Sequence, residues 1–341
     1  MDVLDKPLNH GYGIILSPRD LTLPLNLSAM AAGRSTERIE LEIGFGNGEY
    51  TVQYARAHPE VLLFGLEVSP SCVLRCARRS AREMAACPDN LRLIRADAGL
   101  MMRELFPDES LDRVFMNFPC PWPKSRHAGR RVTARGFADG LAAVLRVGGV
   151  FELTTDDAPY AEEAEARLGG HPALEAGARE VNPLRPTTTK YERKWMAEGK
   201  DIYRLTFAKA RPFTAPRRTW GTPHNGCNGS EGSTMHVRTE RPVTEAFMAS
   251  LNGASGGAED SHWAFGRHYA APGAFLLETF SRDEAFEQRY YIRVTQRGGG
   301  SLVQLDRTAN AFLTPAVRGS LRDAADRLAA QGAINEREAQ T

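Results

Sequence analysis

Residues Leu41–Glu49 read LEIGFGNGE, and this stretch decides the fold. The residues before it, Arg38–Ile43, are predicted to form a strand, and Glu49–Ala57 to form a helix. Glycines in a strand-to-helix turn let the backbone approach a ligand closely, where a side chain would clash. The stretch therefore predicts the first ligand-binding turn of an α/β fold.

Two carboxylates beside these glycines indicate the kind of ligand. A dinucleotide site needs a third glycine at the position of Glu49. Glu42, on the strand before the turn, would also repel a pyrophosphate, but it would attract a ligand with a cationic amino group and a sulfonium. S-adenosylmethionine is such a ligand and is favoured over a dinucleotide, with Gly44, Gly46 and Gly48 beside it.

Strands and helices alternate from Arg38 to about Phe207. This alternation is typical of a parallel sheet covered by helices on both faces. Gly148-Gly149 is expected to stop a helix and lead directly into a strand. The expected strands are Arg38–Ile43, Val61–Leu66, Leu91–Ile94, Leu111–Met116, Val150–Thr154 and Ile202–Phe207, and the expected helices are Glu49–Ala57, Pro70–Ala86, Ala98–Leu105, Val132–Leu145 and Pro159–Leu168.

Acidic residues follow the next two strands of this series. Glu67 ends the second strand, where an acid can accept both hydroxyls of a ribose. Asp97 ends the third, where a carboxylate can accept from the amino group of an adenine. For each acid alone, an exposed strand-end carboxylate or a helix N-cap is the more common explanation. Together with Glu42, they fall in order after three successive strands, which indicates a nucleoside site.

The run Asn117–His127 reads NFPCPWPKSRH and follows the fourth strand. Its prolines fix φ and remove backbone donors, so neither a helix nor a central strand passes through it. An aromatic ring, Trp122, lies beside a dense basic cluster, a combination that stacks on a base while holding phosphates. The alternative is a proline-rich surface turn with a solvated basic face.

These motifs together resemble one family, the tRNA (guanine-N7)-methyltransferases. The family's glycine-rich motif is similar to Glu42–Gly48, and its proline loop with a basic run is similar to Asn117–Arg131. A later pair resembles Thr155-Asp156, and a Thr-Lys-aromatic-Glu box resembles Thr189–Glu192. The similarity spans roughly Arg38 to Lys209.

The resemblance implies a fold, a reaction and a partner. The fold is the class I S-adenosylmethionine-dependent methyltransferase fold, a Rossmann-like α/β domain with a seven-strand, mainly parallel sheet. Its last strand, near Ile202–Phe207, is expected to be reversed in a hairpin with its predecessor. The reaction is methyl transfer from S-adenosylmethionine to N7 of a guanine in the variable loop of tRNA.

The resemblance also implies roles for individual residues. The methyl donor would be bound by Glu42, Gly44, Gly46, Gly48, Glu67, Asp97 and Asn117. The tRNA would be bound by Lys124, Arg126, His127, Arg130, Arg131, Asp156, Thr189, Lys190, Tyr191 and Glu192.

Cys120 departs from the family's pattern, which has an aspartate in this loop. Guanine N7 carries an exposed lone pair and no proton at neutral pH, so its alkylation needs no general base. Alignment of N7, the methyl carbon and the sulfur provides much of the catalysis. Cys120 is therefore predicted to be a catalytic-site residue with a positional role.

Two other functions compete with this interpretation. A Pro-Cys after the fourth strand is also where cytosine-C5 methyltransferases keep a nucleophilic cysteine. A second Thr-Cys motif and a Glu-Asn-Val motif, which would accompany it, do not occur in the chain. The other alternative is a non-catalytic RNA-binding module. Measured S-adenosylmethionine binding separates that module from an enzyme.

Composition constrains partners and compartment. The formal net charge of +1 means that nucleic-acid affinity must come from a local patch. The N-terminus lacks a secretory pattern, no apolar run approaches membrane-spanning length, and the five cysteines show no metal-like pairing. The chain is expected to be cytoplasmic, with no membrane or metal partner. Its oligomeric state is not indicated.

The length of 341 residues favours two domains. The boundaries are expected at 1–211 for the methyltransferase domain, 212–234 for a linker rich in Pro, Gly, Ser and Thr, and 235–341 for a small α+β domain. In the latter, alternation from Phe286 to Val294, then Gly298-Gly299-Gly300 and Ser301–Asp306, predicts a β-hairpin. Helices are expected at Pro242–Leu251 and Pro315–Ala330. No motif assigns this domain a role, although its arginines would suit additional contacts with tRNA.

Overall fold

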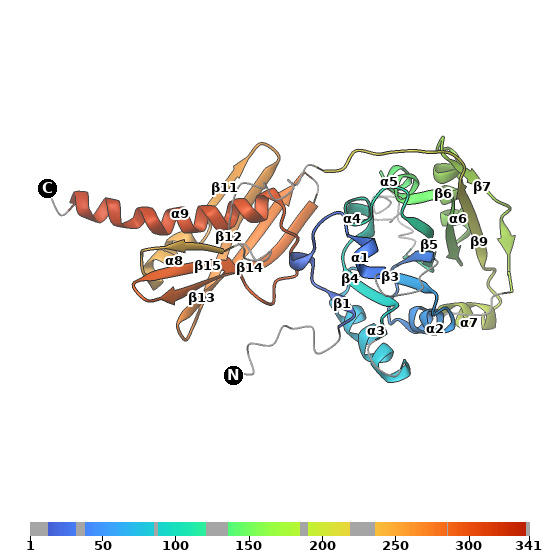
Figure 1. Cartoon of the computed structure of the whole chain (residues 1–341), viewed down its shortest axis with the longest axis horizontal. Coiled ribbons are helices and arrows are strands. Elements are labelled where there is room, and N and C mark those ends of the chain that lie inside the picture. Colours follow the sequence, from blue (N-terminus) through green and yellow to red (C-terminus); the bar gives the residue numbers. More distant parts are fainter. Residues whose placement is uncertain are drawn as a thin grey trace. The chain divides into compact units, whose positions relative to one another are not determined.

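The computed structural model describes residues 13–31, 38–84, 88–120, 136–184, 190–218, 236–284 and 286–338. Contacts divide the chain into two compact units (Figure 1), one of which contains Thr22–Arg218 and the other the chain from Thr219 onward. Each unit has its own sheet and core. The domain limits expected from composition stay a prediction, and residues 219–234 of the expected linker lie outside the described residues.

The first unit contains a nine-stranded sheet in the order β1-β4-β3-β2-β5-β6-β9-β7, with β8 paired to β9. Pairing is parallel from β1 to β6 and antiparallel from β6 to β9, and β9 is also antiparallel to β7 and β8. The expected class I architecture is confirmed, including the reversed last strand. The strands are β1(Ile15–Leu16), β2(Arg38–Ile43), β3(Val61–Glu67), β4(Leu91–Arg95), β5(Leu111–Asn117), β6(Leu145–Thr155), β7(Leu174–Ala176), β8(Glu180–Val181) and β9(Tyr203–Lys209).

Two differences from the expected strands have physical reasons. The two-residue strands β1 and β8 extend the sheet beyond seven strands, and both are too short to show a period in the sequence. Strand β6 begins at Leu145 rather than Val150, so Gly148-Gly149 lies within the strand and does not stop the helix. Gly148 has φ of +82°, and the register with β5 shifts between Leu111 and Arg113, so the glycines accommodate an irregularity in the strand.

Helices cover both faces of this sheet, with α4 and α5 on one side and α2 and α3 on the other (Figure 1). Strand β3 is buried along all its residues, as expected for a central strand of a doubly covered sheet. Phe64 on β3 packs edge-on against Phe106 at 5.3 Å between ring centres. The helices of this unit are α1(Leu27–Ala31), α2(Glu49–Ala57), α3(Pro70–Glu83), α4(Ala98–Leu105), α5(Phe137–Val144), α6(Ala158–Gly169) and α7(Lys190–Ala197). The 3-10 helix η2(Pro18–Asp20) belongs by its contacts to the other unit.

The second unit contains a six-stranded antiparallel sheet in the order β10-β15-β14-β13-β12-β11. The predicted hairpin β14(Phe286–Arg297) and β15(Gly300–Leu305) and the α+β class are confirmed. Strands β10 to β13 were not predicted, because their polar and small residues give a weak alternation. The other elements are β10(His236–Thr239), α8(Glu245–Leu251), β11(Ser255–Ala258), β12(Ser261–Ala271), β13(Ala274–Asp283) and α9(Pro315–Glu338).

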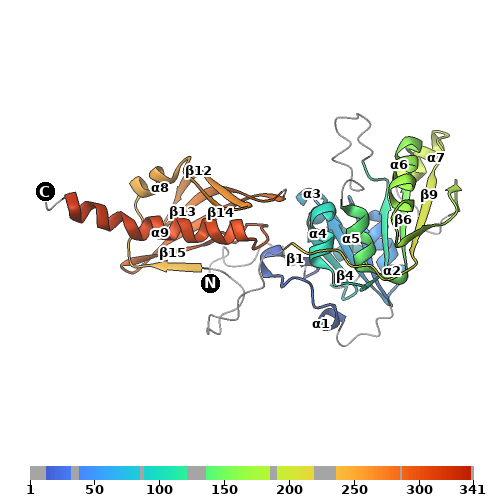
Figure 2. The ribbon, with the colours of Figure 1, turned by 90° about the horizontal axis from the view of Figure 1, so that it is seen from above.

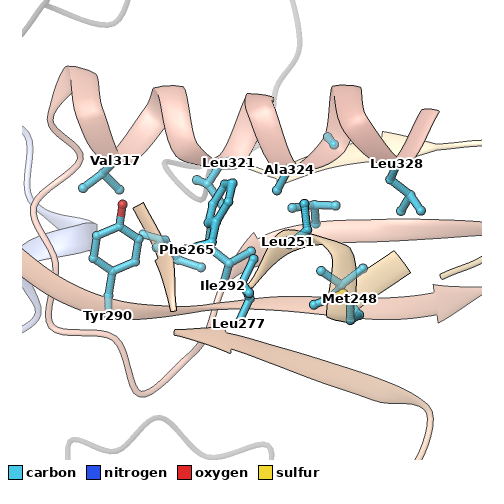
Figure 3. Packing of buried hydrophobic residues seen from close by; sticks show 14 of the residues in the cluster. Met248, Leu251, Phe265, Leu277, Tyr290, Ile292, Val317, Leu321, Ala324 and Leu328 are labelled. Carbon is cyan, nitrogen blue, oxygen red and sulfur yellow. The ribbon is translucent and has the colours of Figure 1, made fainter. Parts of the chain in front are cut away.

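One face of this sheet carries the core of the second unit. Helix α9 runs along the sheet (Figure 2), and its Val317 and Leu321 belong to the same buried cluster as Phe265 of β12 and Ile292 of β14 (Figure 3). Helix α8 adds Met248 to that cluster. Both helices therefore pack on the same face. No described helix of the chain is long and apolar enough to cross a membrane.

Candidate functional site

The turn after β2 is built by glycines in left-handed conformations. Gly44, Gly46 and Gly48 have φ of +73°, +54° and +74°. A Cβ added to Gly44 or Gly46 would meet nothing within 4 Å, whereas one at Gly48 would overlap Cys76 of α3. Gly48 is therefore required by packing as well as by conformation, and the first two glycines face open space that a ligand can enter.

Glu67 holds this turn against the next one. One carboxylate oxygen accepts from Gly46 N at 3.0 Å and the other from Ser69 N at 2.9 Å. Ser69 also accepts, through its side chain, from Cys72 N as the N-cap of α3. Each carboxylate oxygen has a further lone pair, so the predicted contact with a ribose is compatible with these bonds. Glu67 thus fixes the glycine turn and remains able to accept from a ligand.

Glu42 and Asn117 lie together at the ends of neighbouring strands. β2 and β5 are paired in parallel, so their carboxyl ends meet at the same edge of the sheet. Asn117 Nδ2 donates to Glu42 Oε1 at 3.5 Å, and Glu42 is 2% exposed. A buried carboxylate beside an open turn attracts a cationic ligand. The structure brings these two predicted residues into one place.

Asp97 lies at the junction of β4 and α4 and is exposed. Its Oδ1 accepts from Gly99 N at 2.8 Å, which makes it the N-cap of α4. The alternative interpretation of this acid as a cap is therefore correct. The side chain of Asp97 is exposed, so its second carboxylate oxygen can still accept a hydrogen bond from a bound ligand.

The loop after β5 begins in a strained conformation. Phe118 has φ of +51°, and its N–H donates to Thr154 O on β6 at 2.7 Å. Cys120, two residues further on, is exposed. The predicted tRNA contacts Lys124, Arg126, His127, Arg130 and Arg131 lie outside the described residues.

Helix α7 brings the last predicted motif close to the glycine turn. Arg193, the residue after this motif, pairs with Glu49, the first residue of α2. Lys200 Nζ donates to Asp156 Oδ2 at 3.4 Å. Glu192 is buried. Thr189 and the side chains of Lys190 and Tyr191 lie outside the described residues.

Comparisons with known proteins identify this arrangement. The sequence profile of a family described as "Putative methyltransferase" matches residues 36–205. A tRNA (guanine-N(7)-)-methyltransferase of Thermotoga maritima is 35% identical over 86% of this chain and 90% of its own length. One from Thermus thermophilus is 32% identical over 86% and 89%, and one from Nitrosococcus oceani is 38% identical over 60% and 84%.

The chain belongs to the tRNA (guanine-N7)-methyltransferase family.

Its members are enzymes that use S-adenosylmethionine. The alignment with the Thermotoga and Thermus methyltransferases is longer than the first unit alone, so these relatives also match part of the second unit. No group of His, Cys, Asp and Glu among the described residues of this methyltransferase has the arrangement of a metal site.

A charged network beneath the site of this methyltransferase was not predicted. Arg113 on β5 donates to Glu152 Oε2 at 3.0 Å and to Tyr54 Oη at 3.0 Å, and it lies 3.4 Å from Glu40 Oε2. Arg204 on β9 donates to the same Glu152 oxygen at 2.9 Å. The network crosses four strands on the face of the sheet that also carries Glu42.

The network fixes the ionisation of its members. Burial raises the pKa of Glu152, but Arg113 and Arg204 outweigh burial and hold that pKa below its ordinary value. Burial lowers the pKa of Arg113, but Glu152 and Tyr54 outweigh it and raise that pKa. The signal in the sequence is the set of charged residues at alternating positions of otherwise apolar strands, as in Glu40 and Glu42 of β2.

Proposed function

We propose that this enzyme transfers a methyl group from S-adenosylmethionine to N7 of a guanine in the variable loop of tRNA, in the cytoplasm. The observation that carries the proposal is the buried Glu42, held by Asn117 beside glycines that face open space. The names of the similar methyltransferases support the substrate. The choice of the variable loop rests on the family's resemblance.

The residues at the strand ends fit the donor. S-adenosylmethionine supplies a methyl group on a cationic sulfur, which makes that carbon an electrophile. Glu42 and Asn117 would hold the cationic end, a buried carboxylate being a strong partner for an ammonium group. Gly44 and Gly46 would allow close approach, and Glu67 would accept from the ribose. Asp97, with one oxygen used as a cap, would accept from the adenine amino group with the other.

The reaction demands alignment rather than proton removal. The lone pair of guanine N7 attacks the methyl carbon, and the carbon–sulfur bond breaks with its electron pair remaining on sulfur. Positioning of this kind can supply several kcal/mol, roughly 7–11 in well-oriented intramolecular systems. Cys120, exposed at the end of β5, would orient the base and would not form a covalent bond with it.

The tRNA would be held by the proline loop and by the box before and within α7. Lys124, Arg126, His127, Arg130 and Arg131 would bind phosphates, and Asp156 with Thr189–Glu192 would contact the target nucleotide. The ion pair of Arg193 with Glu49 supports this arrangement, because it fastens α7 next to the glycine turn. The substrate and donor sites would thus be joined through α2.

Nucleoside analysis tests the proposal. Unmodified tRNA is incubated with the full chain and isotopically labelled S-adenosylmethionine, then digested and analysed by mass spectrometry. Labelled 7-methylguanosine from a fragment of the variable loop is expected. Labelled 5-methylcytidine, or no transfer by a folded protein that binds the donor, would contradict the proposal.

A further inference from the structure

The sheet of the second unit has one face covered by helices and one that no described helix of the unit covers. Phe265, Leu277 and Ile292 lie on the covered face, in the cluster with α9 (Figure 3). Because successive side chains of a strand point to opposite faces, their neighbours in sequence lie on the other face. We name this second surface the open face. It is formed by β10, β15, β14, β13 and β12.

Aromatic rings are exposed on the open face. Phe280 of β13 is 44% exposed and Tyr269 of β12 is 47% exposed. Tyr291 of β14 lies edge-on to Tyr269 at 6.2 Å between ring centres. Tyr269 is opposite Leu276, four residues from Phe280 along β13, which is roughly 13 Å at 3.3 Å per residue. The two exposed rings are therefore far enough apart to stack on separate bases.

Arginines accompany these rings. The Arg289 guanidinium lies 5.4 Å from the centre of the Phe280 ring and pairs with Glu278, and Arg293 pairs with Asp306 at 2.8 Å. Three further arginines of this face are exposed and form no ion pair with any described residue: Arg238, Arg282 and Arg297. Of the acids on this face, Glu278 and Asp306 pair with arginine, whereas Glu287 of β14 is exposed and lies opposite Arg282. The five arginines named here outnumber these three acids, so the net charge of the face is positive.

We propose that the open face binds unpaired nucleotides of the tRNA substrate, with bases stacked on Phe280 and Tyr269 and phosphates held by Arg238, Arg282 and Arg297. The choice of tRNA rests on the proposed function. Single-stranded RNA is recognised by aromatic rings on a sheet combined with basic side chains along the backbone. RNA is favoured over a protein partner because the unpaired arginines complement a polyanionic backbone and lie on the same face as rings on which bases can stack.

The test uses variants of the full chain and an unmodified tRNA transcript. Phe280→Leu keeps an apolar side chain but removes the ring, and it should weaken tRNA binding about five- to a hundredfold. Phe280→Trp should restore the affinity, since an indole also stacks. Phe280 is 44% exposed and does not belong to the buried cluster of the unit, so both variants are expected to fold. Equal tRNA affinity of wild type and Phe280→Leu would overturn the stacking role.

Salt dependence tests the arginines separately. Arg282→Ala and Arg238→Ala should each reduce the slope of log affinity against log salt by about one, since each phosphate contact releases about one counterion. Arg322→Ala, an exposed arginine of α9 on the other side of the unit, is the matched control and should leave the slope unchanged. Identical slopes for all three variants would overturn the phosphate contacts.

Two further measurements separate this proposal from the proposed function and from a protein partner. Competition with a short unpaired RNA should displace tRNA from wild type but much less from Phe280→Leu, and this can be measured even if no methyl transfer occurs. Donor affinity should be the same in all variants. A change of oligomeric state in Phe280→Leu, with unchanged affinity for both RNAs, would assign the open face to a protein contact and overturn the proposal.

Discussion

The two sheets of this protein differ in where their charged side chains lie and in whether those side chains are paired. In the first unit, the partly buried Arg113 and the buried Glu152 lie within the sheet's layers and neutralise one another. In the second, Arg282 and Arg297 are exposed on a face that no described helix of that unit covers. The first sheet is covered on both sides, so only its strand ends reach a ligand. The second is covered on one side, so the strands themselves offer a surface.

The difference teaches where function can be located on each sheet. A parallel sheet between two helix layers exposes its carboxyl edge, where Glu42 and Asn117 meet. An antiparallel sheet with one helix layer exposes every second residue of each strand. Chemistry that requires a small, buried pocket belongs to the first arrangement. Contact with an extended polymer belongs to the second.

The largest effect is expected from breaking the buried network. Arg113→Met leaves Glu40 and Glu152 buried with fewer partners, and removal of one member of such a network costs about 3–5 kcal/mol. Arg282→Met, on the exposed face, should change stability by no more than about 0.5 kcal/mol. Hydrogen exchange of the β5 and β13 amides reports the two units separately. Equal destabilisation by the two variants would show that the paired charges of the first sheet contribute no more to stability than the unpaired charges of the second.

The loss of stability at low pH is a second test of the same network. The folded pKa of Glu152 lies below its ordinary value of 4.5, so its stabilisation is present above that pH and is lost as the pH falls through the folded pKa. In Arg113→Met the folded pKa should rise toward the ordinary value, because only Arg204 remains as a cationic partner. The opening free energy of β6 amides, obtained from exchange rates corrected for intrinsic exchange between about pH 6 and pH 3, should then depend less on pH in the variant.

The first unit was largely predictable because its elements carry local signals. Helices α2 and α4 were predicted with their observed bounds, since a glycine turn and an aspartate cap mark their starts. The start of β6 was not predictable, because the backbone at Gly148 depends on the pairing with β5. Strands β12 and β13 were missed because polar residues and the irregularity between Phe265 and His268, where Gly266 lies, interrupt their alternation.

The candidate site was predictable to a similar extent. Glu42 and Asn117 were assigned from motifs at the ends of neighbouring strands, and they lie together. The pairing of Arg193 with Glu49 joins residues 144 positions apart, so no local pattern reports it. The same holds for Arg113 and its partners on four strands. Charges inside strands indicate that some pairing exists, but they do not specify the partner.

The next largest effect should appear at the strand ends. Glu42→Ala removes a charged partner from the proposed donor site, and loss of a hydrogen bond to a charged group costs about 1.5–3 kcal/mol, a ten- to hundredfold loss of S-adenosylmethionine affinity. Calorimetric titration with the donor measures it. Glu287→Ala, an exposed acid on the second sheet, is the control and should leave donor affinity unchanged. Unchanged affinity in Glu42→Ala would remove that residue from the donor site.

Substitutions of two glycines in the turn should distinguish a role in packing from a role in letting the ligand approach. Gly48→Ala introduces a Cβ only 2.8 Å from Cys76 Cα, so it should destabilise the first unit by about 1–3 kcal/mol. Gly46→Ala meets open space, and its cost to stability should be limited to the left-handed conformation, roughly 1 kcal/mol. Donor affinity should nevertheless fall in Gly46→Ala, because the added methyl group occupies the proposed site. Denaturation and donor titration of both variants test the pair, and a larger loss of stability in Gly46→Ala would contradict the geometry.

The smallest effect is expected at Cys120, the exposed residue at the end of β5. If it orients the base, Cys120→Ser should retain methyl transfer within about tenfold, or 1.4 kcal/mol. Cys120→Asp should match or exceed the native rate, because the resemblance to the family implies an aspartate at this position and a carboxylate favours the cation that develops on the guanine. Single-turnover methylation of tRNA at saturating donor measures the chemical step apart from binding.

A loss of roughly a thousandfold or more in Cys120→Ser, with donor and tRNA affinities intact, corresponds to about 4 kcal/mol and is too large for a positional contact. That outcome would indicate that the Cys120 thiol is a nucleophile. The protein should then also form a covalent adduct with RNA that contains 5-fluorocytosine.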